Sequence, residues 1–465
     1  MTNASLYLEN IENLARGFGL DYFPVRFQSV PPSFMTEVAV YGLPVRMPHW
    51  SFGVRYIYQL IQHRMGHSHI FEVVVPGDPG QAFLADTNNE AENTLVLAHV
   101  LGHADFSKNN MLFRRTQEQV GYHIVEQAAA HAYQINQAIE RHGQARVERV
   151  LDAALSLEQH IDTHRDLRRA PYPAAEDRVE PAHPDPFRER LARLSPLEAE
   201  ENGSGDQSKT AQAVGRKSVP VPPHPEADLL WFIAHYAPDM EPWERDIFLA
   251  VRQESFYFQP IFSCQIMNEG WASYWHARLL REASFLPQDL YLEAIKTHSD
   301  VVRPYAADEQ VALAINPYHL GFVLWDRLIE EGGIEAARRV MIEEDDAGFI
   351  RNYLDQELAK ELKLFQYRQR RNGEITAADM DLDAIKEDLL RAKYNFGAPH
   401  IVVEAIRRDG CLILRHEHNM DGRGLDPDAA HHVLGYIQQV WRRGVRLQTV
   451  NKRGQEEWLS VEDAT

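Results

Sequence analysis

Apolar residues recur at helical spacing through most of this 465-residue chain, and one long segment interrupts the pattern. That segment runs from Pro171 to about Pro225 and is rich in Pro, Gly, Ser and charged residues. Such a composition cannot bury a core, so it indicates a linker or an insertion. Helical patterns lie on both sides of it, and hairpin patterns begin only near Pro399. The sequence therefore predicts a mainly α-helical fold, a large helical body with a small C-terminal α+β domain.

These changes in pattern divide the chain into four parts. We expect an N-terminal helical part over 1–170, the linker or insertion over 171–226, a second helical part over 227–398, and a C-terminal domain of order ββαββ over 399–465. Within the helical parts, the sequence pattern predicts helices over 4–18, 51–65 and 90–104 and helical structure over 319–395. The composition, rich in Ala, Glu, Gln and His, predicts a long helical tract over about 117–168. The segment HIFEVVV, at 69–75, is β-branched and predicts a short strand.

The charge and the N-terminal sequence exclude several classes of protein. Lys and Arg total 48 against 68 Asp and Glu, a net charge of −20, so the surface repels nucleic acid and anionic lipid. The first twenty residues lack the apolar core of a signal peptide, and no apolar run is long enough for membrane insertion. The two cysteines, Cys264 and Cys411, are too far apart in the chain for a CxxC zinc site. We expect a cytoplasmic protein, and the sequence leaves its oligomeric state open.

Two histidines stand four residues apart in NTLVLAHVLGHADFSKN, residues 93–109. Residues i and i+4 lie on one face of a helix with Cβ atoms about 5–6 Å apart, so His99 and His103 can bind one metal ion together. The glutamate of an HExxH motif is absent, because Val100 stands in its position. Taken alone, the pair leaves two interpretations open: metal ligands, or two histidines of the core.

A second motif, IMNEGWASYWH, begins a strongly apolar helix. Glu269 lies among large apolar residues there, and a buried carboxylate needs a cation, a donor or a proton. His276 follows seven residues later, two helical turns away, and shares a face with Glu269. Gly270 and Ala272 are small and permit the close approach of another element. The alternative is an ion pair between Glu269 and a nearby arginine.

The segment NEGWASYW resembles the NEGFASY element of the HExxH-type gluzincin aminopeptidases, in which the glutamate is the third zinc ligand. The resemblance implies a divalent metal, zinc first and iron or manganese as alternatives, held by His99, His103 and Glu269. The sequence departs from that family at Val100 and in the much longer gap between His103 and Glu269. Another carboxylate must then act as the base; Glu254 and Asp105 are the candidates.

Five segments together resemble the stage V sporulation protein R (SpoVR) family: GLPVRMPHWSFG, AHVLGHADFSKNN, EPWERDI, IMNEGWASYWHAR and NPYHLGF. Their order and spacing cover nearly the whole chain. The resemblance implies a cytosolic protein with a large helical body, a role in spore-cortex formation, and association with a PrkA-like serine kinase and a von Willebrand A-like protein. It does not supply a biochemical activity.

The hypothesis that follows is a metal-dependent hydrolase acting on an amide bond in a peptide or a cell-wall precursor. His276 would bind or polarise the substrate, and Glu254 or Asp105 would serve as the base. Two alternatives stay open. One is a non-catalytic regulatory scaffold in which the His and Glu residues form a structural metal site or a polar core. The other is a non-haem iron enzyme of the oxygenase type, because its facial triad is also His₂-carboxylate.

Three further segments contain candidate anchoring or site residues with weaker support. His49 and Trp50 lie in a Pro- and Gly-rich loop, where we expect them to anchor the loop to the core. Glu72 would be buried in its predicted strand and would then pair with a cation or a metal. The segment INPYHLGF predicts a helix with Asn316 as its N-cap, and His319 and Tyr318 are candidates to face the same cavity.

Overall fold

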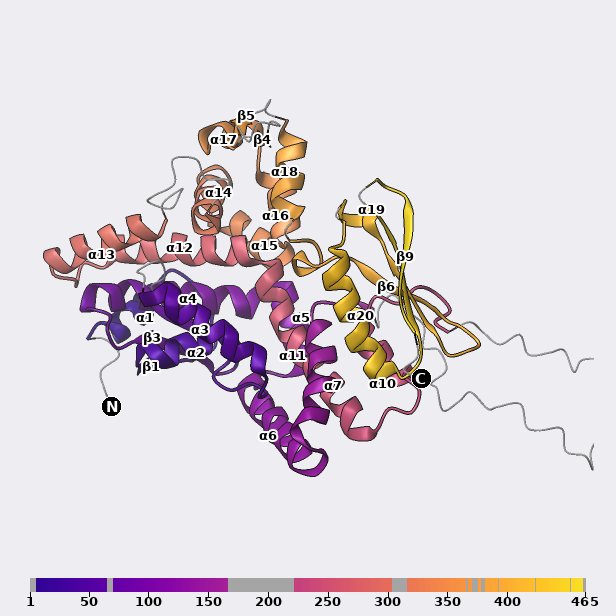
Figure 1. The fold of residues 1–465 in the computed structure, drawn as a ribbon. Helices are drawn as coiled ribbons and strands as arrows, with labels where there is room; N and C mark the ends of the chain where they lie inside the picture. The colour runs from indigo at the N-terminus through magenta and orange to yellow at the C-terminus, as the bar shows by residue number, and fades with distance from the viewer. Residues whose placement is uncertain are drawn as a thin grey trace, which may run out of the picture.

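The computed structural model describes residues 6–64, 70–165, 221–302, 316–364, 367–369, 375–377, 381–391, 393–422, 424–451 and 453–462. Residues 171–220 of the predicted linker lie outside these ranges. The fold is a mainly α-helical body that carries a small C-terminal domain with a four-stranded sheet, as the sequence predicts (Figure 1).

The N-terminal part is built mainly from helices. They are α1 (Leu8–Gly17), α2 (Pro32–Tyr41), α3 (Trp50–Arg64), α4 (Glu90–Asn109), α5 (Met111–Val120), α6 (Ile124–His142) and α7 (Gln144–Ser156). The prediction of one long helical tract over 117–168 is wrong. Gly121 and Gly143, with φ of +89° and +84°, follow α5 and α6 directly. A positive φ ends a helix and suits glycine, so the tract breaks at these two points.

A three-stranded sheet lies beside these helices. Its strands are β1 (Val25–Val30), β2 (Glu72–Val75) and β3 (Gly80–Ala85), in the order β1-β3-β2. β3 pairs parallel with β1 and antiparallel with β2. The sequence pattern predicts β2, whereas β3 went unrecognised. The sheet positions the functional region, because Glu72 begins β2 next to α4.

The second helical part contains the central helix of the body. Its helices are α10 (Leu229–Tyr236), α11 (Pro242–Ser263), α12 (Gln265–Glu282), α13 (Gln288–Val301), α14 (Pro317–Gly332), α15 (Ile334–Glu343), α16 (Asp346–Tyr353), α17 (Gln356–Glu361) and α18 (Leu382–Arg391). The described residues of the region 319–395 are mainly helical, as predicted; they also form a small hairpin of β4 (Tyr367–Gln369) with β5 (Ile375–Ala377) and the start of a short 3₁₀ helix (Tyr394–Gly397).

Helix α12 runs alongside α4 and packs on α14 (Figure 1). Glycines make both contacts close. A Cβ added to Gly270 would lie 2.2 Å from the backbone of Gly321 in α14, and one added to Gly102 in α4 would lie 2.6 Å from Ala272 Cα. Larger residues would force the helices apart. The small residues of the NEGWA segment therefore permit close approach, as the sequence indicates.

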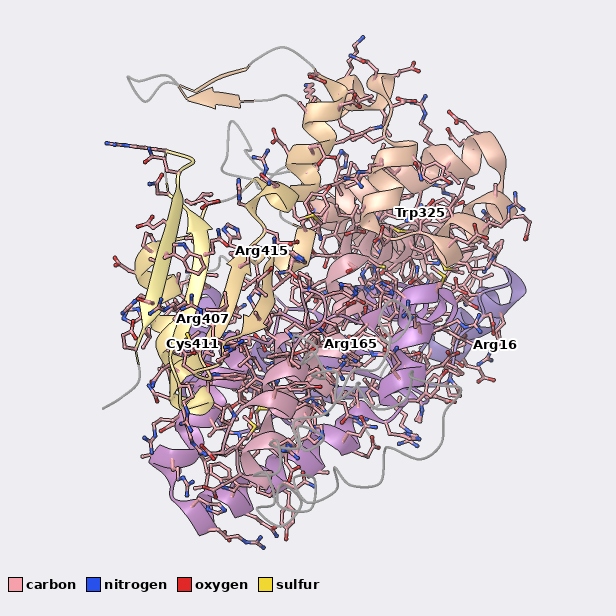
Figure 2. The ribbon with its side chains drawn as sticks, turned by 90° about the vertical axis from the view of Figure 1, so that its right-hand side faces the viewer. Arg16, Arg165, Trp325, Arg407, Cys411 and Arg415 are labelled. Atoms are coloured by element: carbon pink, nitrogen blue, oxygen red, sulfur yellow. The ribbon has the colours of Figure 1, made fainter. Side chains whose placement is uncertain are left out.

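The C-terminal domain follows the predicted ββαββ order. It comprises β6 (Ile401–Ile406), β7 (Leu412–His416), the short α19 (His418–Asp421), α20 (Pro427–Trp441), β8 (Val445–Val450) and β9 (Glu456–Val461). The strand order is β6-β7-β8-β9, with two antiparallel hairpins joined by the parallel pair β7–β8. In Figure 2, Arg407, Cys411 and Arg415 lie on or beside this sheet, while Trp325 lies among the helices of the body.

Two apolar cores stabilise the molecule. One core joins α7, α10 and α11 to the sheet and α20 of the C-terminal domain. The other is built around α4, α12 and α14, and it surrounds the histidine pair. Within the described ranges, no helix combines the length and the apolar composition that a membrane crossing requires.

Candidate metal centre

Two helices bring the three predicted ligands together. His99 and His103 lie on one face of α4, and Glu269 lies on α12 where the two helices pack closely. One ligand atom from each of these residues lies within 4.8 Å of the others. His99 Nε2 and His103 Nε2 are 3.0 Å apart, and Glu269 Oε2 lies 3.6 Å from the first and 3.4 Å from the second. The three atoms therefore converge on one point.

These separations fit a common metal ion. Ligand atoms at about 2.0–2.1 Å from a tetrahedral zinc lie about 3.3 Å apart, and the observed values bracket that figure. Glu269 Oε2 is buried and forms no hydrogen bond within the described part of the chain. A buried carboxylate oxygen that faces two ring nitrogens requires a cation or a proton between them. The donor set suits zinc or iron better than magnesium or calcium.

Asn268 determines which nitrogen of His103 faces His99 and Glu269, and thus which could bind a metal ion. Its Oδ1 lies 2.9 Å from His103 Nδ1. A carbonyl oxygen only accepts, so Nδ1 carries a proton and Nε2 is the nitrogen that faces Glu269. Burial lowers the pKa of His103, but the Glu269 carboxylate raises it overall. Metal-binding histidines commonly have such a partner on the second ring nitrogen, because it fixes the tautomer and the ring orientation.

A series of hydrogen-bonded histidines fixes the tautomer and the orientation of the His99 ring in the same way. His99 Nδ1 lies 2.9 Å from His276 Nδ1, and His276 Nε2 lies 2.5 Å from His298 Nδ1 on α13. If each ring donates one proton to the next, every contact is satisfied and His99 Nε2 is left unprotonated. Burial lowers the pKa of both His276 and His298, which favours these neutral rings. His276 thus contacts the predicted ligand His99 directly.

Two more side chains from distant elements face the centre. Glu72 Oε1 lies 3.9 Å from His99 Nε2, and the Tyr318 ring stacks beside the His99 ring with centroids 6.2 Å apart. Burial raises the pKa of Glu72, and the Glu269 carboxylate together with burial raises that of Tyr318. Burial opposes ionisation of Glu269 too, but the adjacent His103 and His99 rings lower its pKa overall. The structure therefore places a carboxyl group and a phenol at the edge of the ligand cluster.

A cavity of about 340 Å³ opens onto this cluster. That volume lies within the range of small-molecule sites. Ten described residues line it: Ile70, Phe71, Glu72, Glu92, Leu95, Val96, His99, His276, Thr297 and Tyr318. A ligand in the cavity would therefore contact one face of α4 as well as the ligand cluster.

Glu254, one of the two predicted bases, has other partners. Its two carboxylate oxygens accept from Arg46 Nε at 2.9 Å and contact His131 Nδ1 at 3.1 Å. It is fully buried in this network and is not among the described residues that line the cavity. The structure does not bring Glu254 to the histidines.

Asp105, the other predicted base, lies on the opposite face of α4. Two residues along a helix turn the side chain by about 200°, so Asp105 points away from the face of His103. Its oxygens accept from Asp21 N at 2.7 Å and from Trp271 Nε1 at 2.9 Å, and Arg338 pairs with it at 3.5 Å. These contacts give Asp105 a structural role between helices.

Sequence reasoning missed Asn268 and His298. Asn268 directly precedes Glu269, so its adjacency to a candidate ligand was the available signal. His298 lies 22 residues from its partner His276, and no local spacing connects them. Glu72 and Tyr318 were singled out with weaker support, and both line the cavity.

The weaker indications outside the cavity have structural explanations. His49 Nε2 and Trp50 Nε1 both contact Asp152 Oδ1 of α7, at 3.0 and 2.9 Å. His49 ends the loop, whereas Trp50 begins α3 and is 53% exposed, so its ring does not anchor the loop in the core as expected. Asn316 caps α14 by accepting from Tyr318 N at 3.0 Å. That cap orients the first turn of α14, which carries Tyr318 to the cavity.

Comparison with known proteins identifies the family. The profile described as "SpoVR like protein" matches residues 2–398, and the profile described as "SpoVR-like C-terminal domain" matches residues 399–452. The chain belongs to the SpoVR family. It is also similar to a protein of Escherichia coli K12 described as "Uncharacterized protein YcgB", with 27% identity over 491 residues, covering 98% of this chain and 93% of the relative. No solved structure matches the chain.

The SpoVR profiles account for both parts of the fold. The longer one spans the helical body that carries His99, His103 and Glu269, and the shorter one spans most of the four-stranded domain. Neither description names a reaction, so the chemistry of a SpoVR protein has to be argued from the geometry of the histidine cluster.

Proposed function

We propose that this SpoVR-family protein is a metal-dependent hydrolase that cleaves an amide bond in a peptide or a cell-wall precursor. The observation that carries the proposal is the convergence of three lone-pair atoms beside a cavity that His99 lines. They are His99 Nε2, His103 Nε2 and Glu269 Oε2, within 4.8 Å of one another. A zinc ion held there would lower the pKa of a water molecule to about 7.

Glu72 is the group best placed to act as the base. Its carboxylate faces the ligand cluster from the sheet side, 3.9 Å from His99 Nε2, and it lines the cavity. It can accept the proton of an attacking water and pass that proton to the departing amine. Glu72 would thereby supply the function of the glutamate that Val100 replaces in the HExxH pattern.

Tyr318 supplies a donor on the cavity side. Its pKa is raised, so the phenol keeps its proton at neutral pH. A protonated phenol at the cavity wall can donate a hydrogen bond to the oxygen of a carbonyl that gains negative charge during attack. Asn268 and His276 act differently: they hold the two histidine rings in the orientation that binding requires.

Two rival assignments lead to different expectations. A regulatory scaffold beside a PrkA-like kinase needs only a closed structural metal site, whereas this cluster opens onto a cavity of about 340 Å³. An iron enzyme of the oxygenase type would use the same three ligands. The presence of Glu72 and Tyr318 beside the cluster favours hydrolysis, because an oxygenase triad does not require a base or a carbonyl-oriented donor.

Metal analysis of the purified full chain tests the ligand set. We expect near-stoichiometric zinc in the wild type by plasma mass spectrometry, and its loss in a His99→Ala/His103→Ala double variant. His416→Ala is the matched control, since His416 is also buried but lies in the C-terminal sheet, where it contacts Thr449. Iron in place of zinc would support the oxygenase assignment, and a metal-free wild type after reconstitution would refute both enzymatic assignments.

Cleavage of a peptide mixture, followed by mass spectrometry, tests the reaction. We expect Glu72→Gln to retain its metal and to lose at least about a hundredfold in rate, because removing a general base costs that much or more. An unchanged rate in this variant would show that Glu72 is not the base.

A further inference from the structure

The wall of the cavity along α4 extends well beyond the histidine cluster. Glu92, Leu95, Val96 and His99 all line the cavity. Their spacing of three, four and seven residues places them on one face of the helix. Glu92 lies two turns from His99, about 10 Å along the axis. This wall therefore connects the candidate metal centre to a carboxylate in the first turn of α4.

The charged side chains that line the described part of the cavity, apart from histidine, are all acidic. Among the described residues that line the cavity, the charged side chains apart from histidine are Glu72 and Glu92, and none is Lys or Arg. The wall between Glu92 and His99 is apolar, through Leu95 and Val96. Another carboxylate lies close to the far end, because Glu293 accepts a hydrogen bond from Asn89, the N-cap residue of α4. An apolar wall that ends in carboxylates suits an aliphatic chain with an ammonium group at its tip.

The local structure of α4 does not require the charge of Glu92. Glu92 belongs to a capping box in which its Oε2 accepts from Asn89 N at 2.8 Å. A glutamine fills that role as well as a glutamate. The cap uses one carboxylate oxygen, so the negative charge and the second oxygen are available to a ligand.

Building on the hydrolase function proposed above, we propose that the substrate carries a primary amine within about 10 Å of the amide bond to be cleaved. Peptides that contain a lysine or a diamino acid belong to this class. The amine pairs with Glu92, its aliphatic stem lies along Leu95 and Val96, and the amide reaches the cluster at His99. A substrate with an anionic group in that position is excluded by the carboxylates.

Calorimetric titration of the metal-loaded full chain with two matched amides tests the proposal. Nα-acetyl-lysinamide and Nα-acetyl-norleucinamide have nearly the same length and differ in the terminal ammonium group. We expect the lysine compound to bind the wild type at least about tenfold more tightly, the effect of one charge-assisted contact of about 1.4 kcal/mol. Glu92→Gln should abolish this preference without changing the metal content.

Glu90→Gln is the matched control. Glu90 lies in the same first turn of α4, its carboxylate accepts from Leu6 N, and it is not among the described residues that line the cavity. It should keep the tenfold preference. Equal affinity of the two amides, no binding of the lysine compound at millimolar concentration, or a preference that survives in Glu92→Gln would each overturn the inference. Metal content is measured on the same samples, so the absence of metal would instead identify a failure of the proposed hydrolase.

Discussion

Asn268 offers the most selective test of the ligand cluster at the scale of single residues. Its Oδ1 accepts a hydrogen bond from His103 Nδ1–H, which leaves His103 Nε2 as the nitrogen that can bind a metal ion. Asn268→Leu should weaken metal binding roughly tenfold to a hundredfold, as the loss of such partners commonly does. Asn268→Asp retains an acceptor at the same place and should preserve affinity. Competition with a coloured chelator measures both constants, and equal affinities for the two variants would contradict this role.

Asp346 gives a pH-dependent prediction at the same scale. Its carboxylate accepts from Ile266 N and Met267 N at 3.0 and 2.9 Å, which caps the start of α12. Burial raises the pKa of Asp346 from 3.8 to about 6, although Lys393 and these N–H groups oppose the shift. The native state therefore favours the protonated form more than the unfolded state does.

The sign of the effect follows from these two pKa values. The contribution of protonated Asp346 to the free energy of unfolding is complete below pH 3.8 and is lost as the pH rises through about 6. Relative to an Asp346→Asn variant, the free energy of unfolding of the wild type should fall by about 2 kcal/mol between pH 4 and pH 7. Urea titrations of metal-free samples at several pH values measure the difference. A constant difference would mean that Asp346 does not titrate in this range.

At the scale of secondary-structure elements, the packing of α12 depends on glycine. A side chain at Gly270 would meet the backbone of Gly321 at 2.2 Å. Gly270→Ala should destabilise the fold by about 1–3 kcal/mol or more, and it should also weaken metal binding because Glu269 is the preceding residue. Gly435→Ala in α20 is the control. A Cβ there meets nothing within 4 Å, so this change should stabilise by about 0.5–1 kcal/mol. Denaturant unfolding compares the two variants.

The same elements show how much of the site could be predicted from the sequence. The i, i+4 spacing of His99 and His103 and the apolar surroundings of Glu269 are local signals that marked these residues as candidates, and the resemblance of NEGWASYW to the gluzincin element joined them into one predicted set. The structure brings the three side chains together. Gly121 and Gly143 were local signals for the breaks in the tract predicted over 117–168. The helix-favouring composition of the tract outweighed them in the prediction.

The roles of Glu254, Asp105 and Glu72 could not be predicted from the sequence, because they depend on partners that are distant in the chain. Glu254 and Asp105 were selected because their surroundings are apolar. Whether a buried carboxylate is a base or a structural ion depends on its partner, and Arg46 lies 208 residues from Glu254. Glu72 reaches His99 only because its strand, β2, pairs with β3 beside α4. The sequence pattern did not predict β3.

At the scale of the whole molecule, a buried ion pair helps to link the helical body to the C-terminal domain. Arg442, just after α20, donates to both carboxylate oxygens of Glu244 in α11, at 2.7 and 2.8 Å. Glu244 is 3% exposed, and its other cationic neighbour, Arg146, lies 3.9 Å away. The link lies at the edge of the core shared by α7, α10, α11 and the sheet.

Removing the Arg442 side chain should therefore strongly destabilise the unit that the C-terminal domain forms with α7, α10 and α11. Arg442→Ala leaves a buried carboxylate without its main partner, which typically costs about 3–5 kcal/mol. Arg443→Ala is the adjacent control: its partner Asp239 is exposed, so the loss should stay below about 1 kcal/mol. Because the second core, around α4, α12 and α14, holds the candidate ligands and contains neither Arg442 nor Glu244, metal content should be unchanged in both variants. Denaturant unfolding and metal analysis of the same samples test this, and loss of metal in Arg442→Ala would show that the two cores are coupled.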